Sequence, residues 1–232
     1  MQPPDGPGTV IVTGGASGLG AATARAVRDA RGTAIVLDRN EPEDGFEREL
    51  VDLAFPREAE QAVAHVLDRH DDVRGVVTAA AIDVPGRLDD VAGDTWDRIV
   101  TINLLGTAAV VRAALPVLER NAGRVVTVAS TLAHKAVSDA TAYCASKFGV
   151  IGFSRALADE TAGRVGVTML SPGGMATHFF DARDERYKPP PDASLNDPAH
   201  VAQAILFALR QPAGCELREL VITPAVESSW PP

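Results

Sequence analysis

A tyrosine and a lysine four residues apart, Tyr143 and Lys147, are the pair in this sequence best suited to acid–base chemistry. On a helix, this spacing places both side chains on one face, one turn apart. A free tyrosine has a pKa of about 10 and is too weakly ionised near neutral pH to accept a proton from an alcohol. A neighbouring ammonium group stabilises the phenolate and lowers that pKa. The pair therefore indicates proton transfer at a hydroxyl or carbonyl oxygen.

Ser130 precedes this tyrosine by 13 residues and follows an apolar run, Arg124–Ala129, that we expect to be a buried strand. In open parallel sheets the carboxyl ends of the strands face the ligand crevice. Ser130 can there donate a hydrogen bond to a substrate oxygen and hold it against Tyr143. A helical Tyr–Lys pair alone is more often part of a surface face, and the added serine is what favours a catalytic site.

A glycine-rich turn lies between the first apolar run, Thr9–Thr13, and a periodic Ala-rich stretch. Glycines let the backbone turn sharply and approach a pyrophosphate, and a helix N-terminus offers free N–H groups and a favourable dipole. A tight turn without a ligand is the alternative, but the position between a strand and a helix favours a dinucleotide. The expected contacts are Gly14, Ser17, Gly18, Leu19 and Gly20.

The second expected strand, Thr33–Leu37, is followed by Asp38 and Arg39. A carboxylate at this position can accept hydrogen bonds from both ribose hydroxyls of NAD, and it would repel the 2′-phosphate of NADP. A strand-end carboxylate that merely starts a turn is the alternative for Asp38. Arg39 can instead serve the 2′-phosphate. The sequence therefore predicts NAD as the cofactor, with NADP less favoured.

Short apolar runs alternate with longer periodic stretches along the chain. Runs that are apolar throughout are typical of strands buried on both faces, and helical crossovers between them make the sheet parallel. The pattern predicts an α/β fold, a single-domain doubly wound parallel sheet of about seven strands with helices on both faces. The other expected strands are Glu49–Leu53, Val73–Ala79, Val165–Leu170 and Leu217–Thr223. The expected helices are Leu19–Ala30, Arg57–Arg69, Thr95–Arg120 (one helix or two abutting ones), Thr141–Thr161 and Pro198–Arg210.

The catalytic domain is expected to span residues 9–223, between a flexible N-terminal segment, 1–8, and a C-terminal tail, 224–232. The longest irregular stretch, 171–197, is rich in proline, and a loop of that length in a compact domain is usually a functional lid or a mobile segment. About a dozen residues separate Leu37 from the third strand, which barely leaves room for a crossover helix.

These motifs together resemble the short-chain dehydrogenase/reductases, a family of Rossmann-fold oxidoreductases. The resemblance is carried by Thr13-Gly-x-x-x-Gly-x-Gly20, by Ser130 and by Tyr143-x-x-x-Lys147. It covers nearly the whole chain, with each motif at the expected element, so the motifs are jointly more specific than any one alone. The further matching motifs are Asp52-Leu53, Asn103-x-x-Gly106 and Pro172-Gly173-Gly174-Met175-Ala176-Thr177.

The resemblance implies a role for each of these residues. Tyr143 is the general acid/base, Lys147 tunes it and binds the nicotinamide ribose, and Ser130 orients the substrate. Asn103 holds a water in a proton relay, although from the residues alone it is a helix-interior side chain with a satisfied local hydrogen bond. The implied cofactor contacts beyond the glycine turn are Asp52, Leu53, Tyr143, Lys147, Pro172, Gly173, Met175 and Thr177.

The chain departs from the family pattern after the fourth strand. Thr78-Ala79-Ala80-Ala81 stands where the family has Asn-Asn-Ala-Gly, a run that supports the sheet and the adenosine side of the cofactor. Small residues keep the space, so Ala79, Ala80 and Ala81 remain expected cofactor contacts, but the hydrogen bonds of the asparagines are lost. We expect this departure to affect cofactor affinity more than chemistry.

The composition argues against several other classes of protein. The net charge is −9, from 22 Lys+Arg and 31 Asp+Glu, which disfavours nucleic-acid binding. Two cysteines 71 residues apart, without a Cys/His cluster, indicate reduced thiols and no metal site. No apolar run approaches the ~20 residues that cross a bilayer, and residues 1–8 lack a signal peptide's features. We therefore expect a cytoplasmic protein with no nucleic-acid or membrane partner.

The favoured function is hydride transfer between NAD(H) and a secondary alcohol or ketone of a small substrate. An NADP-dependent ketoreductase is one alternative, and a non-catalytic dinucleotide-binding regulator is a less favoured one. Met175, Phe179 and Phe180 indicate an apolar wall for a 3-hydroxyacyl or steroid-like substrate, although ordinary loop packing is an equal alternative.

Substrate specificity is expected to lie in three irregular segments, Val84–Asp94, His134–Ala142 and Gly174–Lys188. Within the second of them, His134 and Lys135 are expected to be solvated. Two long helices, around Asn103–Leu118 and Tyr143–Ala158, carry many small apolar residues, and the first is apolar nearly all round, which is usual for a helix buried on more than one side. Burial under the lid of the same chain is the alternative. The pattern and the resemblance together predict a homodimer or homotetramer.

Overall fold

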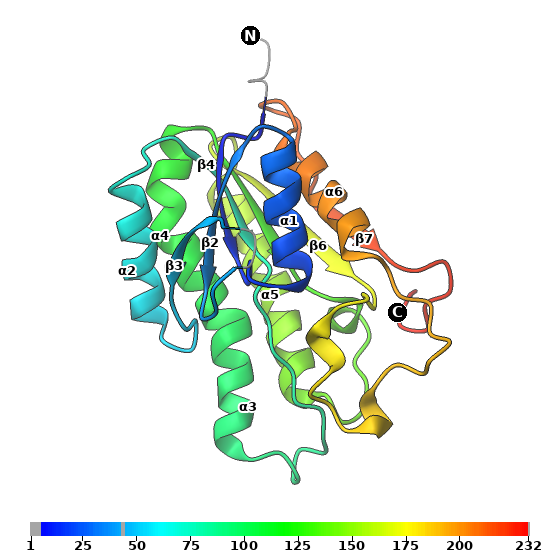
Figure 1. Cartoon of the computed structure of the whole chain (residues 1–232). Helices are drawn as coiled ribbons and strands as arrows, with labels where there is room; N and C mark the ends of the chain where they lie inside the picture. Colours follow the sequence, from blue (N-terminus) through cyan, green and yellow to red (C-terminus); the bar gives the residue numbers. More distant parts are fainter. Residues whose placement is uncertain (1–5, 43–44, 232) are drawn as a thin grey trace.

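The computed structural model describes residues 6–42 and 45–231, so most of the predicted N-terminal segment, 1–8, lies outside the described residues. Seven parallel strands form one sheet in the order β3-β2-β1-β4-β5-β6-β7 (Figure 1). This confirms the predicted single-domain, doubly wound α/β fold. The strands are β1 Thr9–Thr13, β2 Thr33–Asp38, β3 Glu47–Leu50, β4 Val73–Thr78, β5 Arg124–Val128, β6 Gly166–Pro172 and β7 Glu219–Ile222.

The centre of the sheet is built from β-branched residues. Every residue of β1 and of β5 is buried, and these strands are rich in valine and threonine, whose stiff side chains favour extended backbone. The strand order reverses at β1, which has β2 on one side and β4 on the other. Such a switch point opens a ligand crevice outside the carboxyl ends of the strands.

Helices cover both faces of the sheet. One core cluster joins α1 and α6 to the sheet, and the other joins α2, α4 and α5 to its opposite face (Figure 1). The helices begin and end within about two residues of the predicted bounds. They are α1 Gly18–Asp29, α2 Pro56–Leu67, α3 Gly93–Val100, α4 Thr107–Arg120, α5 Thr141–Glu160 and α6 Pro198–Leu209.

The third strand was predicted two or three residues too late. β3 pairs with β2 through Glu47–Leu50, whereas Val51 and Leu53 leave the strand to be buried in the core. β3 is an edge strand whose charged side chains are mostly exposed, so its pattern lacks the apolar run that marks a central strand. Between β2 and β3 the described residues, 39–42 and 45–46, contain no helix, in line with the short connection.

The middle helix is continuous but not uniform. A π-helical turn, η1 (Thr101–Gly106), joins α3 to α4, so the predicted helix is one helix with a locally widened turn. Gly93–Arg120 is long and apolar enough to cross a membrane, and the sequence prediction that no such stretch exists was wrong for this helix. Half of its apolar window is buried, with α4 packed against α2 and β4, which is typical of a core helix.

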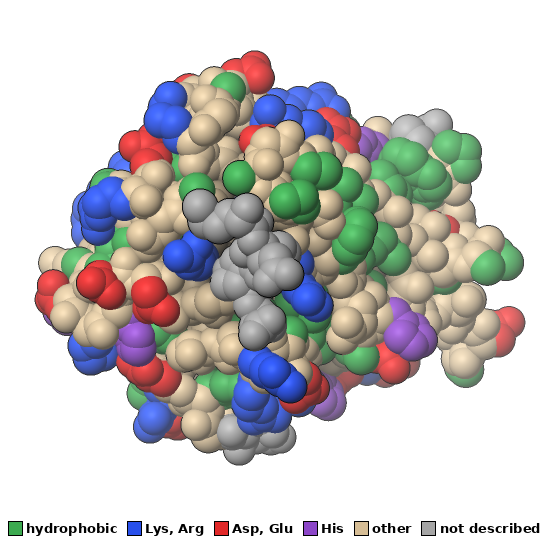
Figure 2. Space-filling view, turned by 90° about the horizontal axis from the view of Figure 1, so that it is seen from above, with side chains coloured by type: hydrophobic (Ala, Val, Ile, Leu, Met, Phe, Trp, Pro, Cys, Tyr) green, Lys and Arg blue, Asp and Glu red, His purple; other side chains and the backbone are tan. Residues whose placement is uncertain are grey.

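The surface is acidic overall, but its charges are not segregated on the face that carries the amino end. Figure 2 shows basic and acidic side chains interspersed there. At the opposite end, where the strands terminate, the segment 171–197 lies beside the start of α5 (Figure 1). It contains two short 3₁₀ turns, η3 His178–Phe180 and η4 Glu185–Tyr187. The crevice outside the strand ends and this segment are where the predicted site residues gather.

Candidate active site

The glycine turn forms a tight cradle at the start of α1. Gly14 has φ +69°, and a Cβ there would lie 2.7 Å from the Cα of Ala80. A Cβ at Gly20 would collide with the carbonyl oxygen of Gly14. Only glycine fits both conditions, because one position needs left-handed backbone and the other has no room for a side chain. The sequence therefore keeps this turn free of side chains for a structural reason.

The N-terminus of α1 has no side-chain cap. Ser17 makes no capping hydrogen bond, and the first turn, which contains Leu19, holds no acidic residue. The first N–H groups of a helix are then available to an anion, whose charge the helix dipole favours. The cradle thus fits a dinucleotide pyrophosphate, and the residues that would hold it are Gly14, Ser17, Gly18, Leu19 and Gly20.

Asp38 lies where its carboxylate can accept hydrogen bonds from the hydroxyls of a ribose. Its Oδ2 accepts from the Ala16 N–H and its Oδ1 from the Asn40 N–H, each at 3.0 Å. These bonds hold the carboxylate beside the glycine turn, and each oxygen retains a further acceptor position. Arg39 is exposed. The arrangement fits the ribose hydroxyls of an adenosine bound at the carboxyl end of β2.

Asp52 and Leu53 lie at the expected edge of the crevice. The Asp52 carboxylate accepts from the Ala54 N–H at 2.9 Å and from Arg98 at 2.7 Å. Burial alone would raise the pKa of Asp52, but these two bonds and the charge of Arg39 hold it below its usual range. Leu53 is buried beneath η1. The carboxylate is therefore ionised and fixed, as a polar contact to a base edge requires.

The segment after β4 is held by neighbours that replace the missing asparagines. The Ala80 N–H donates to Thr13 Oγ1 at 3.1 Å, and the Ile82 N–H donates to Asn103 Oδ1 at 2.9 Å. Thr78 Oγ1 is buried without a hydrogen-bond partner among the described residues. Ala79, Ala80 and Ala81 are half-buried beside the glycine turn, where the motif predicts them.

Asn103 is fully buried within the π-helical turn. Its amide nitrogen donates to the Ile82 carbonyl at 2.9 Å and to Ser146 Oγ at 3.1 Å. The hydrogen bonds of this amide are therefore not local, contrary to what the residues alone suggested. π turns are frequent at functional sites because they redirect backbone groups. The side chain ties the segment after β4 to α5, and its role in holding a water stays a prediction.

Tyr143, Lys147 and Ser130 meet at the carboxyl end of β5. Lys147 Nζ donates to the Val128 carbonyl at 2.7 Å and lies 5.8 Å from the centre of the Tyr143 ring. Ser130 caps the short turn η2 (Thr131–Ala133), is buried together with Tyr143 and lowers the pKa of that tyrosine. The structure thus brings together the three residues that the sequence placed in one site.

Burial works against ionisation of both catalytic groups in the protein alone. It raises the pKa of Tyr143 to about 12, against the opposing hydrogen bond from Ser130. Burial also lowers the pKa of Lys147 to about 8. A positive charge bound beside the phenol would favour the phenolate, and hydroxyl groups beside the lysine would replace its lost water. In the protein alone the phenol of Tyr143 therefore stays protonated near neutral pH.

The segment after β6 closes over the N-terminus of α1. A Cβ built on Gly18 would lie 3.5 Å from the side chain of Thr177, and a cleft of about 410 Å³ opens between them. Met175 pairs with Asn196. Pro172 and Gly173, which are buried, lead from β6 into this contact. Of the motif residues, Ala176 and Thr177 line this cleft together with Gly18 of the glycine turn.

The C-terminal tail packs against the same loops. Glu227 Oε2 accepts from the Gly174 N–H at 3.2 Å, and Ser229 Oγ donates to Thr131 Oγ1 at 2.7 Å. His134 lies 2.9 Å from Ser171 Oγ and packs edge-on against Trp230, so the prediction that His134 is solvated was wrong. The short irregular segment gave no sign of these partners, which lie far away in the sequence.

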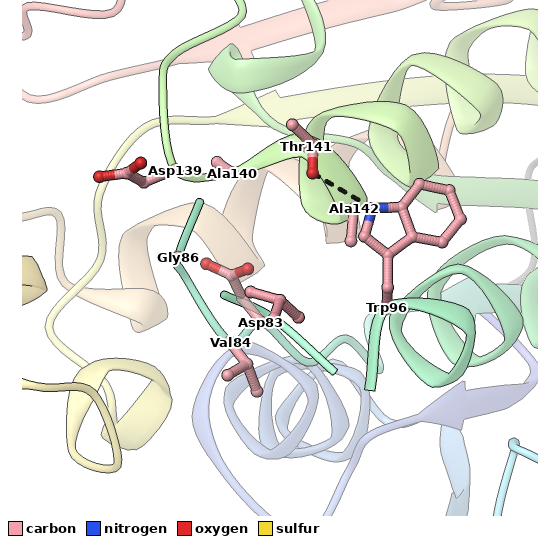
Figure 3. Close-up of a pocket in the computed structure, with 9 residues that line it drawn as sticks. Asp83, Val84, Gly86, Trp96, Asp139, Ala140, Thr141 and Ala142 are labelled. Atoms are coloured by element: carbon pink, nitrogen blue, oxygen red, sulfur yellow. Dashed lines mark hydrogen bonds between the residues drawn. The ribbon is translucent and has the colours of Figure 1, made fainter. Parts of the chain in front are cut away.

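The three predicted specificity segments come together beside Tyr143. The Gly86 N–H donates to the Asp139 carbonyl at 2.7 Å, and the Tyr187 hydroxyl donates to Asp139 Oδ2 at 3.0 Å. Figure 3 shows the crevice where the first two segments meet, with Trp96 bonded to Thr141 at 3.1 Å on one side.

Sequence reasoning missed two residues at this junction, Asp83 and Arg183, which form an ion pair of 2.7 Å. The guanidinium of Arg183 lies over the rings of Phe179 and Phe180. Those rings are therefore not a free apolar wall. A charged residue at the end of the apolar run Ala79–Ile82, which follows β4, was the one signal that could have drawn attention to Asp83.

Comparisons with known proteins agree with this geometry. A model of the short chain dehydrogenase family matches residues 8–188. L-fucose dehydrogenase of Mus musculus is 28% identical over 242 residues, covering 95% of this chain and 89% of that relative. An uncharacterised oxidoreductase of Staphylococcus aureus (strain MW2) is 27% identical over 226 residues, covering 92% of this chain and 96% of its own length.

Two solved structures share the fold. The ligand-free aldohexose dehydrogenase of Thermoplasma acidophilum has a TM-score of 0.86 at 23% identity, covering 93% of this chain and 92% of its own. The alcohol dehydrogenase of the archaeon Thermococcus sibiricus, complexed with 5-hydroxy-NADP, has a TM-score of 0.82 at 23% identity, covering 92% and 95%. The chain therefore belongs to the short-chain dehydrogenase family and is an NAD(P)-dependent oxidoreductase acting on CH–OH donors.

Proposed function

We propose that this protein transfers hydride between NAD(H) and a secondary alcohol or ketone of a small substrate. The observation that carries the proposal is the meeting of Tyr143, Ser130 and Lys147 beside the glycine cradle at the carboxyl ends of the strands. Two of the compared proteins are named for sugars, which fall inside this class of alcohols.

The residues divide the work of alcohol oxidation among them. Ser130 donates a hydrogen bond to the substrate oxygen, and Tyr143, as the phenolate, accepts the hydroxyl proton. Lys147 supplies the positive charge that stabilises the phenolate. The bound nicotinamide dinucleotide supplies the hydride acceptor, or the donor in the reverse direction. In that reverse direction Tyr143 returns the proton to the carbonyl oxygen.

The direct test is reduction of NAD⁺ by a panel of secondary alcohols, followed through the absorbance of NADH. We expect turnover with at least one class of alcohol, and oxidation of NADH by the matching ketone. A folded protein that binds NADH but transfers no hydride in either direction would support the alternative of a dinucleotide-binding regulator.

Cofactor preference is expected to depend on Asp38. We expect its carboxylate to lie close to where the 2′-phosphate of NADP would bind. Charged hydrogen bonds to ribose are worth about 1.5–3 kcal/mol, so kcat/KM should favour NAD by about tenfold or more. Asp38→Ala should weaken NAD and improve NADP, because Arg39 then faces the phosphate unopposed. Asp89→Ala, which removes an exposed carboxylate paired with Arg87, is the matched control. A wild-type preference for NADP would show that Arg39, by binding the 2′-phosphate, determines the cofactor preference instead.

Self-association is expected through η1, α4 and α5. Leu105 and Phe148 are exposed on these elements, and nothing lies within 4 Å of a Cβ built on Gly152. An apolar face that has no protruding side chain at Gly152 allows the helices of a second copy to pack closely against it. Light scattering at micromolar concentration should give two or four times the chain mass of 24.3 kDa. Phe148→Asp should lower that mass, and a wild-type monomer would contradict the proposal.

A further inference from the structure

A buried ion pair that hydride transfer does not use lies next to the reacting groups. Asp83 belongs to the segment that follows β4, and Arg183 to the segment after β6. Arg183 Nη2 donates to Asp83 Oδ2 at 2.7 Å, and the two side chains are only 14% and 4% exposed, respectively. The pair therefore joins two of the segments that line the substrate side of the crevice.

The pair is incomplete in hydrogen bonds. Asp83 Oδ1 and Arg183 Nε are buried and have no partner among the residues that the structure describes. A buried ion pair compensates its desolvation only when its remaining polar atoms are bonded, and leaving a buried polar atom unbonded is costly. Burial raises the pKa of Asp83 against two opposing effects, the charge of Arg183 and a backbone hydrogen bond from Val84. One acceptor, Asp83 Oδ1, and one donor, Arg183 Nε, thus lack a hydrogen-bond partner that a ligand could supply.

Those two atoms lie within reach of the site of hydride transfer. The guanidinium of Arg183 lies 5.0 Å from the centre of the Phe179 ring, and that ring lies 5.9 Å from the Tyr143 ring. On the other side, Asp83 borders the crevice of Figure 3, whose wall includes Ala142, the residue before Tyr143. The ion pair therefore lies beside the aromatic and loop residues that surround Tyr143.

We propose that Asp83 and Arg183 form the polar half of the substrate site, and that the substrate is a neutral polyhydroxylated compound of the sugar or polyol class. Asp83 Oδ1 accepts from one substrate hydroxyl and Arg183 Nε donates to another, while Tyr143 and Ser130 hold the hydroxyl that reacts. This inference rests on the proposed function and names its substrate class.

The charge balance selects a neutral ligand over an ion. The pair carries one charge of each sign, so an anion would meet Asp83 and a cation would meet Arg183. A hydrocarbon or acyl chain would leave both buried atoms unbonded, and sites built to bond a substrate hydroxyl discriminate strongly against analogues that lack it. A hydroxyl can both donate and accept, so neighbouring hydroxyls satisfy both atoms together.

The test compares kcat/KM with NAD⁺ for L-fucose and D-glucose, for cyclohexanol, and for the anion 3-hydroxybutyrate. For at least one of the two sugars, we expect wild type to favour that sugar over each other probe by about a hundredfold. The double variant Asp83→Asn/Arg183→Met removes both charges, so neither is left alone in the interior. It should reduce the ratio of sugar to cyclohexanol by about tenfold or more. Glu185→Gln, which breaks the exposed pair with Lys188 on the same segment, is the control for loop effects.

Three results would overturn the inference while leaving the proposed function in place. The first is an equal kcat/KM of wild type for cyclohexanol and the sugars, and the second is a higher kcat/KM for 3-hydroxybutyrate. The third is an equal loss of kcat/KM on every alcohol in the double variant, which would show that the ion pair only holds the two segments together. The absence of hydride transfer to NAD⁺ from any probe or secondary alcohol would instead overturn both proposals. NADH affinity, measured by fluorescence, separates that case from a protein that has lost its cofactor site.

Discussion

Tyr143→Phe should reduce turnover by about 10²–10⁴-fold, the usual loss when a general acid/base is removed. The change deletes one hydroxyl and keeps the ring, so the contact with Phe179 survives. Thermal stability should stay close to wild type, and NADH affinity should change far less than turnover, because the hydroxyl supports neither the glycine cradle nor the core. Turnover and NADH affinity of purified wild type and variant, with circular dichroism as the check on folding, give the measurement.

Tyr187→Phe is the matched control, since it deletes the hydroxyl of the only other tyrosine in the chain. That hydroxyl donates to Asp139 at the edge of the substrate side, so its loss should change turnover by less than about tenfold. If Tyr143→Phe kept wild-type turnover in a folded protein, another group would be the acid/base and the proposed mechanism would fail.

Lys147→Met should abolish most activity and at the same time make the protein more stable near neutral pH. Burial lowers the pKa of this lysine from 10.5 to about 8, so the folded state binds its proton less readily than the unfolded state does. At about 1.36 kcal/mol per pKa unit, that amounts to roughly 3 kcal/mol below pH 8. The variant also loses the bond to Val128, so we expect a net gain of about 1–2 kcal/mol, or a Tm rise of about 2–8 °C.

The pH dependence of this effect has a definite sign. Between pH 8 and 10.5 the unfolded state holds more protons at Lys147, so wild-type stability rises with pH there and the advantage of the variant shrinks. Tyr143 acts in the opposite sense, because its raised pKa of about 12 makes stability fall with pH above about 10. Lys135→Met, at an exposed lysine, is the control. A variant less stable than wild type at pH 7 would show that the lysine is not desolvated.

The fold and the catalytic residues could be predicted from the sequence because both depend on local patterns. Continuous β-branched runs identify buried parallel strands, and Tyr143 and Lys147 are related by one helical turn, so neither depends on distant contacts. β3 was misplaced because an edge strand with exposed charges lacks such a run. The π turn at Asn103 was not foreseen, since it depends on packing between the middle helix, the segment after β4 and α5.

The substrate side could not be derived for the same physical reason. Asp83 and Arg183 are 100 residues apart, and only the tertiary fold makes them neighbours. The aromatic residues Phe179 and Phe180 were interpreted as an apolar wall because composition does not show what a ring faces. In the structure they face a guanidinium, which turns an apolar signal into part of a polar site.

Two hydrogen bonds, between Gly174 and Glu227 and between Ser229 and Thr131, connect the C-terminal tail to two loops of the candidate active site. One of these loops begins at Ser130 and the other leads toward the cofactor cleft. Any change that displaces Glu227 or Ser229 therefore disturbs both loops at once, although neither residue is among the predicted site residues.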